Sequence, residues 1–164
     1  MCNFDRRKNL TVAVLGGGAV GKAVAADCVL GGNKVRICDL EPFASETLAN
    51  VDKTGITLIG KEKNKYGFKR TGTAHFDLIT SDVAECVKGA KLIIVAVPSI
   101  GQEPFFEKLV SVLEDGMIIH IIPDNYGSLR LRKKMRELGC NKQVIIGGWS
   151  SASYGARVVT EGGV

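Results

Sequence analysis

The sequence predicts an α/β fold in which a doubly wound, mostly parallel sheet carries helices on both faces. Short apolar runs that suit buried strands alternate with helical segments from end to end of the chain. The run 91–97, KLIIVAV, is continuously apolar, which is typical of a strand that is buried on both faces. A chain of 164 residues has the length of one domain, and we expect residues 1–164 to form it.

The stretch 10–39, LTVAVLGGGAVGKAVAADCVLGGNKVRICD, predicts a strand, a tight turn, a helix and a second strand in succession. Its glycines follow the spacing Gly16-x-Gly18-x-x-Gly21, between an apolar strand and an alanine-rich helix at 19–30. This spacing, between a strand and a helix, is the fingerprint of the turn that holds dinucleotides in Rossmann-type folds.

Each glycine of this turn has a separate expected role. Gly16 permits the sharp turn, Gly18 lets the backbone approach a pyrophosphate, and Gly21 lets the helix lie close to the strand. The helix begins at Ala19 and Val20, where free N–H groups and the positive end of the helix dipole favour phosphate. We therefore expect these five residues to bind a dinucleotide cofactor.

The second strand, 34–38, ends at Asp39, at the position of the acid that takes both ribose hydroxyls of an adenosine. A 2′-phosphate would meet the negative charge of this carboxylate, and the following Leu40 and Glu41 supply no compensating base. The sequence therefore favours NAD over NADP. The alternative is that Asp39 merely caps the next helix, which we expect at 42–50 and which Pro42 opens.

The other elements follow the same alternation. We expect strands at 55–60 and 66–72 with a charged turn between them, a strand at 77–80, a helix capped by Ser81 or Asp82 and stopped by Gly89, a helix at 102–113, a strand at 117–122, a helix at 128–138 and a last strand at 143–146.

Ligands of such sheets lie beyond the carboxyl ends of the strands, where the strand order reverses. Val97 ends the strand 91–97, and Pro98 and Ser99 follow it directly. All three are expected to reach the cofactor, although Ser99 could instead cap the following helix. Asn125 and Tyr126 follow the next strand and could touch the nicotinamide or a substrate, or serve turn geometry alone.

Charge and composition argue against several other functions. The net charge of the chain is +5. Its two basic clusters, at 61–70 and 130–136, are typical of a solvent-exposed loop and of the solvent-exposed face of an amphipathic helix. We therefore expect no nucleic-acid partner. The polar N-terminus holds no secretory signal, and no apolar run approaches the ~18 residues of a membrane helix.

The five cysteines form no CxxC pair, so neither a metal site nor a disulfide framework is expected, and a reducing cytoplasm fits them. Neither His75 nor His120 has a carboxylate at an obvious spacing, so neither is expected to act as a general acid or base. Nucleophile motifs such as GxSxG and the ATPase motif GxxxxGK[ST] are absent from the sequence.

Four segments carry a resemblance to a known family: VLGGGAVGKAVAADCVLGG, TGTAHFDLITSDVAECVKGAKLIIVAVPSI, IIPDNYGSLRLRKKMRELG and IIGGWSSASYGARV. Over nearly its whole length the chain resembles the NAD/NADP octopine/nopaline dehydrogenases, or opine dehydrogenases. The resemblance implies that NAD(P)H reduces the imine formed by an amino acid and a 2-oxo acid. It also implies that the catalytic residues lie in a C-terminal helical domain, which is absent from this chain.

The family typically carries Glu-Thr-Ser-Ser and then an arginine in the last segment. Ser150, Ser151 and Arg157 fit this pattern and are implied to face the substrate, whereas Gly148 and Trp149 replace the usual Glu and Thr. Arg157 could hold a substrate carboxylate, with an ordinary surface arginine as the alternative.

Other functions stay open at this point. A 2-oxo acid dehydrogenase, a glycerol-3-phosphate or ketopantoate type of dehydrogenase, and a non-catalytic NAD-sensing module all fit a cofactor domain of this kind. The face on which a second domain would dock could also allow a homodimer.

Overall fold

The computed structural model describes residues 9–60, 70–152 and 155–159. Its strands are β1 Thr11–Leu15, β2 Lys34–Cys38, β3 Ile56–Leu58, β4 Gly72–Ala74, β5 Leu78–Thr80, β6 Leu92–Val95, β7 Ile118–Ile121 and β8 Ile145–Gly148. Its α-helices are α1 Ala19–Leu30, α2 Ala44–Thr47, α3 Val51–Thr54, α4 Val83–Val87, α5 Gln102–Val110 and α6 Gly127–Glu137, and a 3-10 turn spans Ser99–Gly101.

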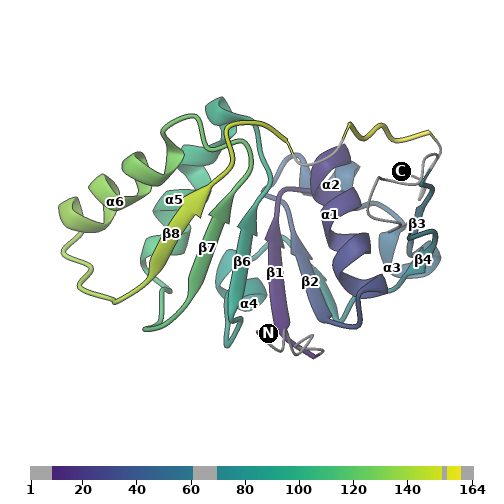
Figure 1. Ribbon diagram of the computed structural model, residues 1–164, viewed down its shortest axis with the longest axis horizontal. Coiled ribbons are helices and arrows are strands. Elements are labelled where there is room, and N and C mark those ends of the chain that lie inside the picture. Colours follow the sequence, from purple (N-terminus) through teal and green to yellow (C-terminus); the bar gives the residue numbers. More distant parts are fainter. Residues whose placement is uncertain (1–8, 61–69, 153–154, 160–164) are drawn as a thin grey trace, which may run out of the picture.

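The main sheet contains six strands in the order β5-β2-β1-β6-β7-β8, and every neighbouring pair is parallel (Figure 1). The predicted doubly wound parallel sheet is therefore confirmed. The chain moves outward from β1 through β2 on one side and through β6, β7 and β8 on the other, so the strand order reverses between β1 and β6. The carboxyl ends of the strands lie at the top of Figure 1.

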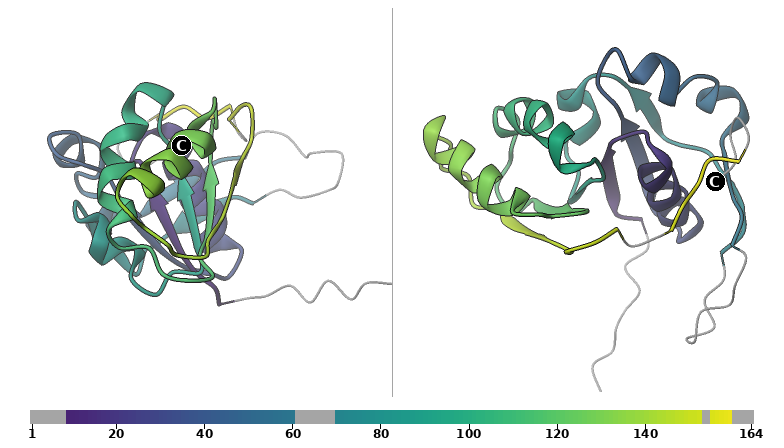
Figure 2. Two further views of the ribbon diagram at one scale, coloured as in Figure 1. Left: turned by 90° about the vertical axis from the view of Figure 1, so that its left-hand side faces the viewer. Right: turned by 90° about the horizontal axis from the view of Figure 1, so that it is seen from above.

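Alternate residues of β1 supply the two cores of the domain, because successive strand side chains point to opposite faces. Val12 and Val14 belong to the core on the α1 side, together with Val24 of that helix. Ala13 and Leu15 belong to the core on the opposite side, where α4, α5 and α6 pack. Figure 2 shows α1 on one side of the sheet and α5 and α6 on the other.

The predicted hairpin is present as the antiparallel pair β3 and β4, which packs beside α1. The predicted first strand, 55–60, shortens to Ile56–Leu58. The second runs over Gly72–Ala74 rather than 66–72, and residues 61–69 lie outside the described part of the chain.

The single helix expected at 42–50 is wrong, because the structure contains two short helices, α2 and α3. Pro42 does not open α2, which begins at Ala44. Asn50 adopts a φ of 60°, in the left-handed region, and a right-handed helix cannot continue through such a residue. Thr47, the last residue of α2, lies next to the carboxyl end of β2, where its hydroxyl contacts Asp39.

Several other bounds differ from the expectation, and the strands expected at 77–80, 91–97 and 117–122 shorten to Leu78–Thr80, Leu92–Val95 and Ile118–Ile121. The helix expected at 102–113 ends at Val110, and α6 begins one residue before 128, at Gly127. β8 spans Ile145–Gly148 instead of 143–146. Its ladder with β7 continues past Ile146 through two glycines, so the strand ends directly before Trp149.

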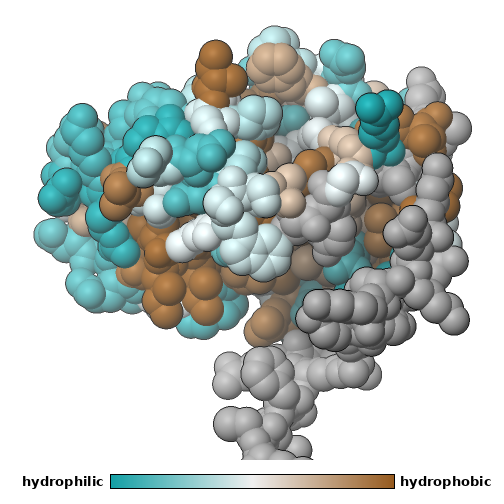
Figure 3. Space-filling view, turned by 45° about the horizontal axis from the view of Figure 1, so that its top comes forward, coloured by the Kyte–Doolittle hydropathy of each residue, from teal (hydrophilic) through white to brown (hydrophobic). Residues whose placement is uncertain are grey.

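One face of the sheet is open over β7 and β8. The helices α5 and α6 cover the opposite face, and no described helix lies in front of these strands in Figure 1. Leu92, Ile118 and Ile145 are in register across β6, β7 and β8, and Ile145 is 64% exposed. The space-filling view shows apolar side chains gathered on the surface of this part of the molecule (Figure 3).

Candidate functional site

The glycine turn between β1 and α1 depends on close backbone contacts. Gly16 has a φ of +113°, and a Cβ there would lie 2.6 Å from the carbonyl oxygen of Ala96 and from Cγ1 of Val97. A Cβ on Gly21 would overlap the carbonyl oxygen of Gly16. The turn and the approach of α1 to β1 therefore both require glycine, as the spacing predicted.

The space in front of the turn is open where a phosphate would lie. A Cβ on Gly18 would meet no described atom within 4 Å. Among the described residues no side chain caps α1, and its first turn holds no acidic residue. The N–H groups near Ala19 and Val20 and the positive helix end are thus available to an anion. The geometry of the turn fits the pyrophosphate of a dinucleotide.

Asp39, directly after β2, is held against this turn. It is 7% exposed, and its Oδ2 accepts hydrogen bonds from the N–H of Gly17 and from Oγ1 of Thr47, both at 2.9 Å. Its Oδ1 accepts the N–H of Leu40 at 2.9 Å. The alternative that Asp39 caps the following helix is wrong, because α2 has Phe43 at its N-cap position and no side-chain cap among the described residues.

A lysine of α1 shares this environment. Burial lowers the pKa of Lys22, and the negative charge of Asp39 opposes the shift by raising it. Lys22 thus brings a positive charge into the neighbourhood of the carboxylate. It lies one position after Gly21 in the glycine motif, where the sequence analysis assigned no role.

The loops that follow β6 and β7 meet at the carboxyl edge of the sheet. Pro98 and Ser99 come after β6, and Oγ of Ser99 accepts a hydrogen bond from Nδ2 of Asn125 at 2.9 Å. Ser99 does not cap α5, whose N-cap position is Gly101. Asn125 and Tyr126 have φ values of 40° and 64°, so both shape the turn before α6, and Asn125 also joins the two loops.

The last segment departs from the rest of the site. Ser150, Ser151 and Arg157 are all exposed. The segment 155–159, yellow in Figure 1, lies at the carboxyl edge on the α1 side of the sheet, and residues 153–154 are outside the described chain. The structure therefore brings together the glycine turn and Asp39, and separately Ser99 and Asn125, but shows no contact that joins Arg157 to either.

The unusual glycine at 148 has a structural reason. A Cβ on Gly148 would overlap the carbonyl oxygen of Ile121 and would lie 2.7 Å from Cβ of Asp124. The N–H of Asp124 also donates to the carbonyl oxygen of Trp149 at 2.7 Å, which holds the two loops together. The glutamate that is usual in the family would not fit this backbone.

His120 of β7 faces the open side of the sheet beside Trp149. The two rings meet edge to face, with centroids 4.8 Å apart, and among the described residues Nε2 of His120 has no hydrogen-bond partner although it is buried. Burial lowers the pKa of His120, and Asp124 opposes this. Burial of the imidazole favours its neutral form, which packs against the indole of Trp149.

Three residues around the glycine turn and Asp39 were missed from the sequence: Gly17, Lys22 and Thr47. The second glycine of the run 16–18 is a weak local signal for Gly17, because it stands at the unspecified position of the motif. Lys22 and Thr47 interact with Asp39, which lies in another part of the chain, and we find no local signal for either.

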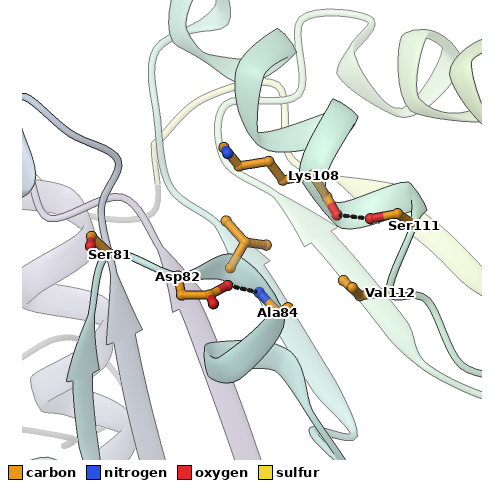
Figure 4. A pocket seen from close by; sticks show the side chains of 7 residues that line it. Ser81, Asp82, Ala84, Lys108, Ser111 and Val112 are labelled. Atoms are coloured by element: carbon orange, nitrogen blue, oxygen red, sulfur yellow. Dashed lines mark hydrogen bonds between the residues drawn. The ribbon is translucent and has the colours of Figure 1, made fainter.

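Two clefts lie away from the glycine turn. One of about 350 Å³ opens between the start of α4 and the end of α5, where the carboxylate of Asp82 accepts the N–H of Ala84 at 2.8 Å (Figure 4). On its other side Oγ of Ser111 donates to the carbonyl oxygen of Lys108 at 2.8 Å. These polar groups form hydrogen bonds with backbone groups at the start of α4 and at the end of α5. A second cleft, of about 190 Å³, opens between α2 and β5 and is lined by Glu41 and Thr80.

The described residues contain no cluster of three or more metal-binding side chains. In the same part of the chain, no helix is long and apolar enough to span a membrane.

Comparisons with known proteins agree with this geometry. The family model described as NAD-dependent glycerol-3-phosphate dehydrogenase N-terminus matches residues 11–123. The chain is 33% identical over 148 residues to opine dehydrogenase from Arthrobacter sp. (strain 1C), a match that covers 90% of this chain and 38% of that protein. The predicted resemblance to opine dehydrogenases is therefore confirmed.

Two further relatives extend the comparison. The chain is 29% identical over 112 residues to the NADP(+)-dependent glycerol-3-phosphate dehydrogenase of Archaeoglobus fulgidus, covering 68% of this chain and 31% of that one. The structure of octopine dehydrogenase with NADH and pyruvate superposes with a TM-score of 0.69 at 22% identity, over 85% of this chain and 35% of that chain. The chain thus spans about a third of the length of these relatives.

Proposed function

Because the chain belongs to the family of NAD-dependent glycerol-3-phosphate dehydrogenase N-terminal domains, we propose that it is the cofactor domain of an oxidoreductase of the opine dehydrogenase type. The observation that carries this proposal is the hydrogen bond from Gly17 to Asp39, which places an uncapped helix N-terminus and a carboxylate at the strand reversal. The helix N-terminus suits the pyrophosphate of a dinucleotide, and the carboxylate suits its adenosine ribose.

In this proposal the pyrophosphate lies against the glycine turn, from Gly16 to Val20, and the adenosine ribose lies at Asp39. A carboxylate offers about four lone-pair sites, of which Gly17, Thr47 and Leu40 take three. Oγ1 of Thr47 also lies 2.9 Å from the carbonyl oxygen of Phe43, and its single proton can go to either acceptor. One site of the Asp39 carboxylate is therefore left for a ribose hydroxyl, and a second becomes free only when the Thr47 side chain turns away.

We propose NAD as the preferred cofactor. A 2′-phosphate at Asp39 would bring two negative groups together in a largely buried place. The next residues, Leu40 and Glu41, offer no positive charge. The positive charge of Lys22 already interacts with Asp39.

The nicotinamide is proposed to lie over the loops of Val97, Pro98 and Ser99, with Asn125 and Tyr126 toward the substrate. Asn125 and Ser99 are hydrogen-bonded to each other, so a ligand that contacts one loop also senses the other. Ser150, Ser151 and Arg157 are proposed substrate contacts, since they are exposed and free of the core. The planar fork of Arg157 suits a carboxylate, which both an amino acid and a 2-oxo acid carry.

The proposed reaction is the reductive condensation of an amino acid with a 2-oxo acid, to which NADH gives a hydride. The chain covers only 38% of its opine dehydrogenase relative, so we propose that a further, helical domain supplies the catalytic acid and base and that this chain alone does not turn over. We propose that the protein lies in the reducing cytoplasm. Cys38 and Cys86 are neighbouring free thiols, and a reducing compartment would keep them from forming a disulfide.

A second candidate is a dehydrogenase that reduces a 2-oxo acid or a phosphorylated ketone. The match of residues 11–123 to the glycerol-3-phosphate dehydrogenase family favours it, as does the similarity to the Archaeoglobus fulgidus enzyme. A third candidate is an NAD-sensing module without catalysis. The open face of β7 and β8, with Ile118 and Ile145, also supports a homodimer, which sedimentation of the chain at several concentrations would test.

The test of the proposed reaction is NADH oxidation by the full-length protein that carries this chain. Opine chemistry requires that the absorbance of NADH falls only when an amino acid and a 2-oxo acid such as pyruvate are supplied together. Turnover with a single carbonyl substrate would support the second candidate instead. NADH binding without turnover on any pair would support the sensing module.

A further inference from the structure

A fully buried glutamine lies behind the nicotinamide end of the proposed site. Gln102, the first residue of α5, is 0% exposed, although glutamine is mostly found at protein surfaces. A buried amide is costly unless its polar atoms are hydrogen-bonded. Both polar atoms of its side chain have hydrogen-bond partners, which come from the loop after β6, the loop after β7 and helix α6.

The side-chain amide joins the ends of two neighbouring strands. Nε2 of Gln102 donates to the carbonyl oxygen of Val97, after β6, at 3.3 Å, and to that of Pro123, after β7, at 2.7 Å. These carbonyls lie just beyond the regular ladder of the two strands, where the loops diverge. One amide group therefore sets the spacing between the two loops.

Arg130 of α6 completes the arrangement. Its guanidinium donates to Oε1 of Gln102 and, at 3.2 Å, to the carbonyl oxygen of Ser99. It also lies over the ring of Phe106, 5.8 Å from the ring centroid. The arginine thus orients the amide so that Nε2 points to the two carbonyls, and it holds the backbone of the proposed cofactor loop directly.

The first residue of α6 is shaped to leave room for this amide. A Cβ on Gly127 would lie 2.6 Å from Oε1 of Gln102. On the outer side of the same two loops, the side chain of Asn125 donates to Ser99 at 2.9 Å. The loops are therefore tied twice, once within the protein by Gln102 and once at the surface by the proposed ligand-contacting residues.

We propose that Gln102, oriented by Arg130, is a positioning residue that sets the distance between the Ser99 and Asn125 loops and so shapes the nicotinamide end of the site. The inference rests on the proposed function, because it requires that a nicotinamide dinucleotide binds here. Because Gln102 is fully buried, it would act on the nicotinamide through Ser99 and Asn125. Among the described residues, no hydrogen bond joins Gln102 to Asp39 or to the glycine turn, where the adenosine half is proposed to lie.

This division into two halves gives a selective test. The titrations use the 164-residue chain with two probes, NADH and ADP-ribose, which share the adenosine and the pyrophosphate and differ in the nicotinamide. The variant Gln102→Met keeps the length of the side chain but removes its hydrogen bonds. The variant Gly127→Ala keeps the glutamine at position 102, but its new Cβ presses against Oε1 of that side chain. Gln143→Met is the matched control, because Gln143 is exposed and lies outside the loops.

We expect the wild-type chain to bind NADH more tightly than ADP-ribose. In Gln102→Met and Gly127→Ala the affinity for NADH should fall about tenfold, while the affinity for ADP-ribose stays within about twofold. Gln143→Met should match the wild type with both probes. Thermal melting identifies any variant that does not fold, and the other variant then carries the comparison.

Other outcomes overturn the inference. An equal loss of affinity for both probes would mean that Gln102 only supports the fold, and unchanged affinities would mean that the spacing of the loops does not matter. Equal binding of NADH and ADP-ribose by the wild type would mean that the nicotinamide makes no contact. Binding of neither probe would refute the proposed function itself, and the positioning role with it.

Discussion

The backbone N–H of Gly17 donates a hydrogen bond to the Asp39 carboxylate at 2.9 Å, across 22 residues of sequence. This contact fixes the turn after β1 to the end of β2 and holds the carboxylate beside the N-terminus of α1. The proposed pyrophosphate and ribose contacts are therefore built as one unit. A substitution of either residue should therefore disturb the position of the other.

Gly17→Ala tests this unit. The new Cβ would lie 2.6 Å from Oγ1 of Thr47 and 2.9 Å from Cδ2 of Leu48, so we expect a loss of about 1 to 3 kcal/mol in the free energy of unfolding and weaker NADH binding. Gly18→Ala is the matched control, since its Cβ meets no described atom within 4 Å. It should melt like the wild type and still bind NADH less well, because the methyl group occupies the space of the pyrophosphate. Equal melting temperatures for the two variants would contradict the packing described for Gly17.

Thr47→Val should reveal how the Asp39 carboxylate is shared. The valine removes a hydrogen bond to a charged group, which costs about 1.5 to 3 kcal/mol of stability. A bound ribose hydroxyl can then replace the missing donor, so we expect the rise in melting temperature on adding NADH to be larger than in the wild type.

The matched control for this substitution is Thr54→Val. Within the described chain, the hydrogen bonds of Thr54 Oγ1 go to the backbone oxygens of Asn50 and Gly55. The NADH-induced shift in this variant should equal that of the wild type. A Thr47→Val shift no larger than the wild-type shift would show that the hydroxyl does not compete with the ribose.

His120 should make stability depend on pH. Burial lowers its pKa below the ordinary 6.5, so between the lowered value and 6.5 the unfolded chain binds more protons than the folded one. The free energy of unfolding therefore rises with pH through that window and becomes independent of this group above it. His120→Phe keeps an aromatic contact with Trp149 and removes the titration.

The difference between wild type and His120→Phe isolates this group from the carboxylates, which titrate in both proteins. We expect the melting temperature of the wild type to fall relative to the variant from about pH 7.5 to about pH 5. A constant difference over that range would mean that the pKa of His120 is the same in the folded and unfolded chains.

Cys38, which is buried, and Cys28, which is partly buried, should resist alkylation. The pKa of Cys38 is raised mainly by a hydrogen bond with Cys86 and in addition by burial. Burial raises the pKa of Cys28 to about 11. Because the thiolate is the reactive form, native chain treated with iodoacetamide near pH 8 should leave both unmodified, as peptide mass spectrometry would show. Chain unfolded in urea should react at both sites. Rapid labelling of Cys38 in the native chain would contradict its burial.

The sequence was sufficient where structure is set locally. Glycine spacing and the apolar runs around it predicted the bounds of α1 and β2 to the residue, and alternation of elements predicted the parallel sheet. It failed at 42–50, where a left-handed Asn50 breaks a helix that the composition favours. Backbone conformation at such a position depends on packing as well as on the residue.

The residues of the proposed site were predicted where a local pattern marks them and missed where their contacts depend on packing. Gly16, Gly21 and Asp39 carry a recognisable spacing, whereas Thr47 and Gln102 act through partners in other elements. Two alternatives that the sequence left open, caps by Asp39 and by Ser99, were decided by such partners. The ligand contacts of all these residues stay predictions, and so does the second domain.

The central claim is that this chain binds NAD through the glycine turn and Asp39. Calorimetric titration with NADH and then NADPH, on the wild type and on Asp39→Ala, tests it most directly. We predict tighter binding of NADH by the wild type, and in the variant a loss for NADH with a relative gain for NADPH, whose 2′-phosphate no longer meets a carboxylate and can face Lys22. Tighter NADPH binding by the wild type, or an unchanged preference in Asp39→Ala, would contradict the account.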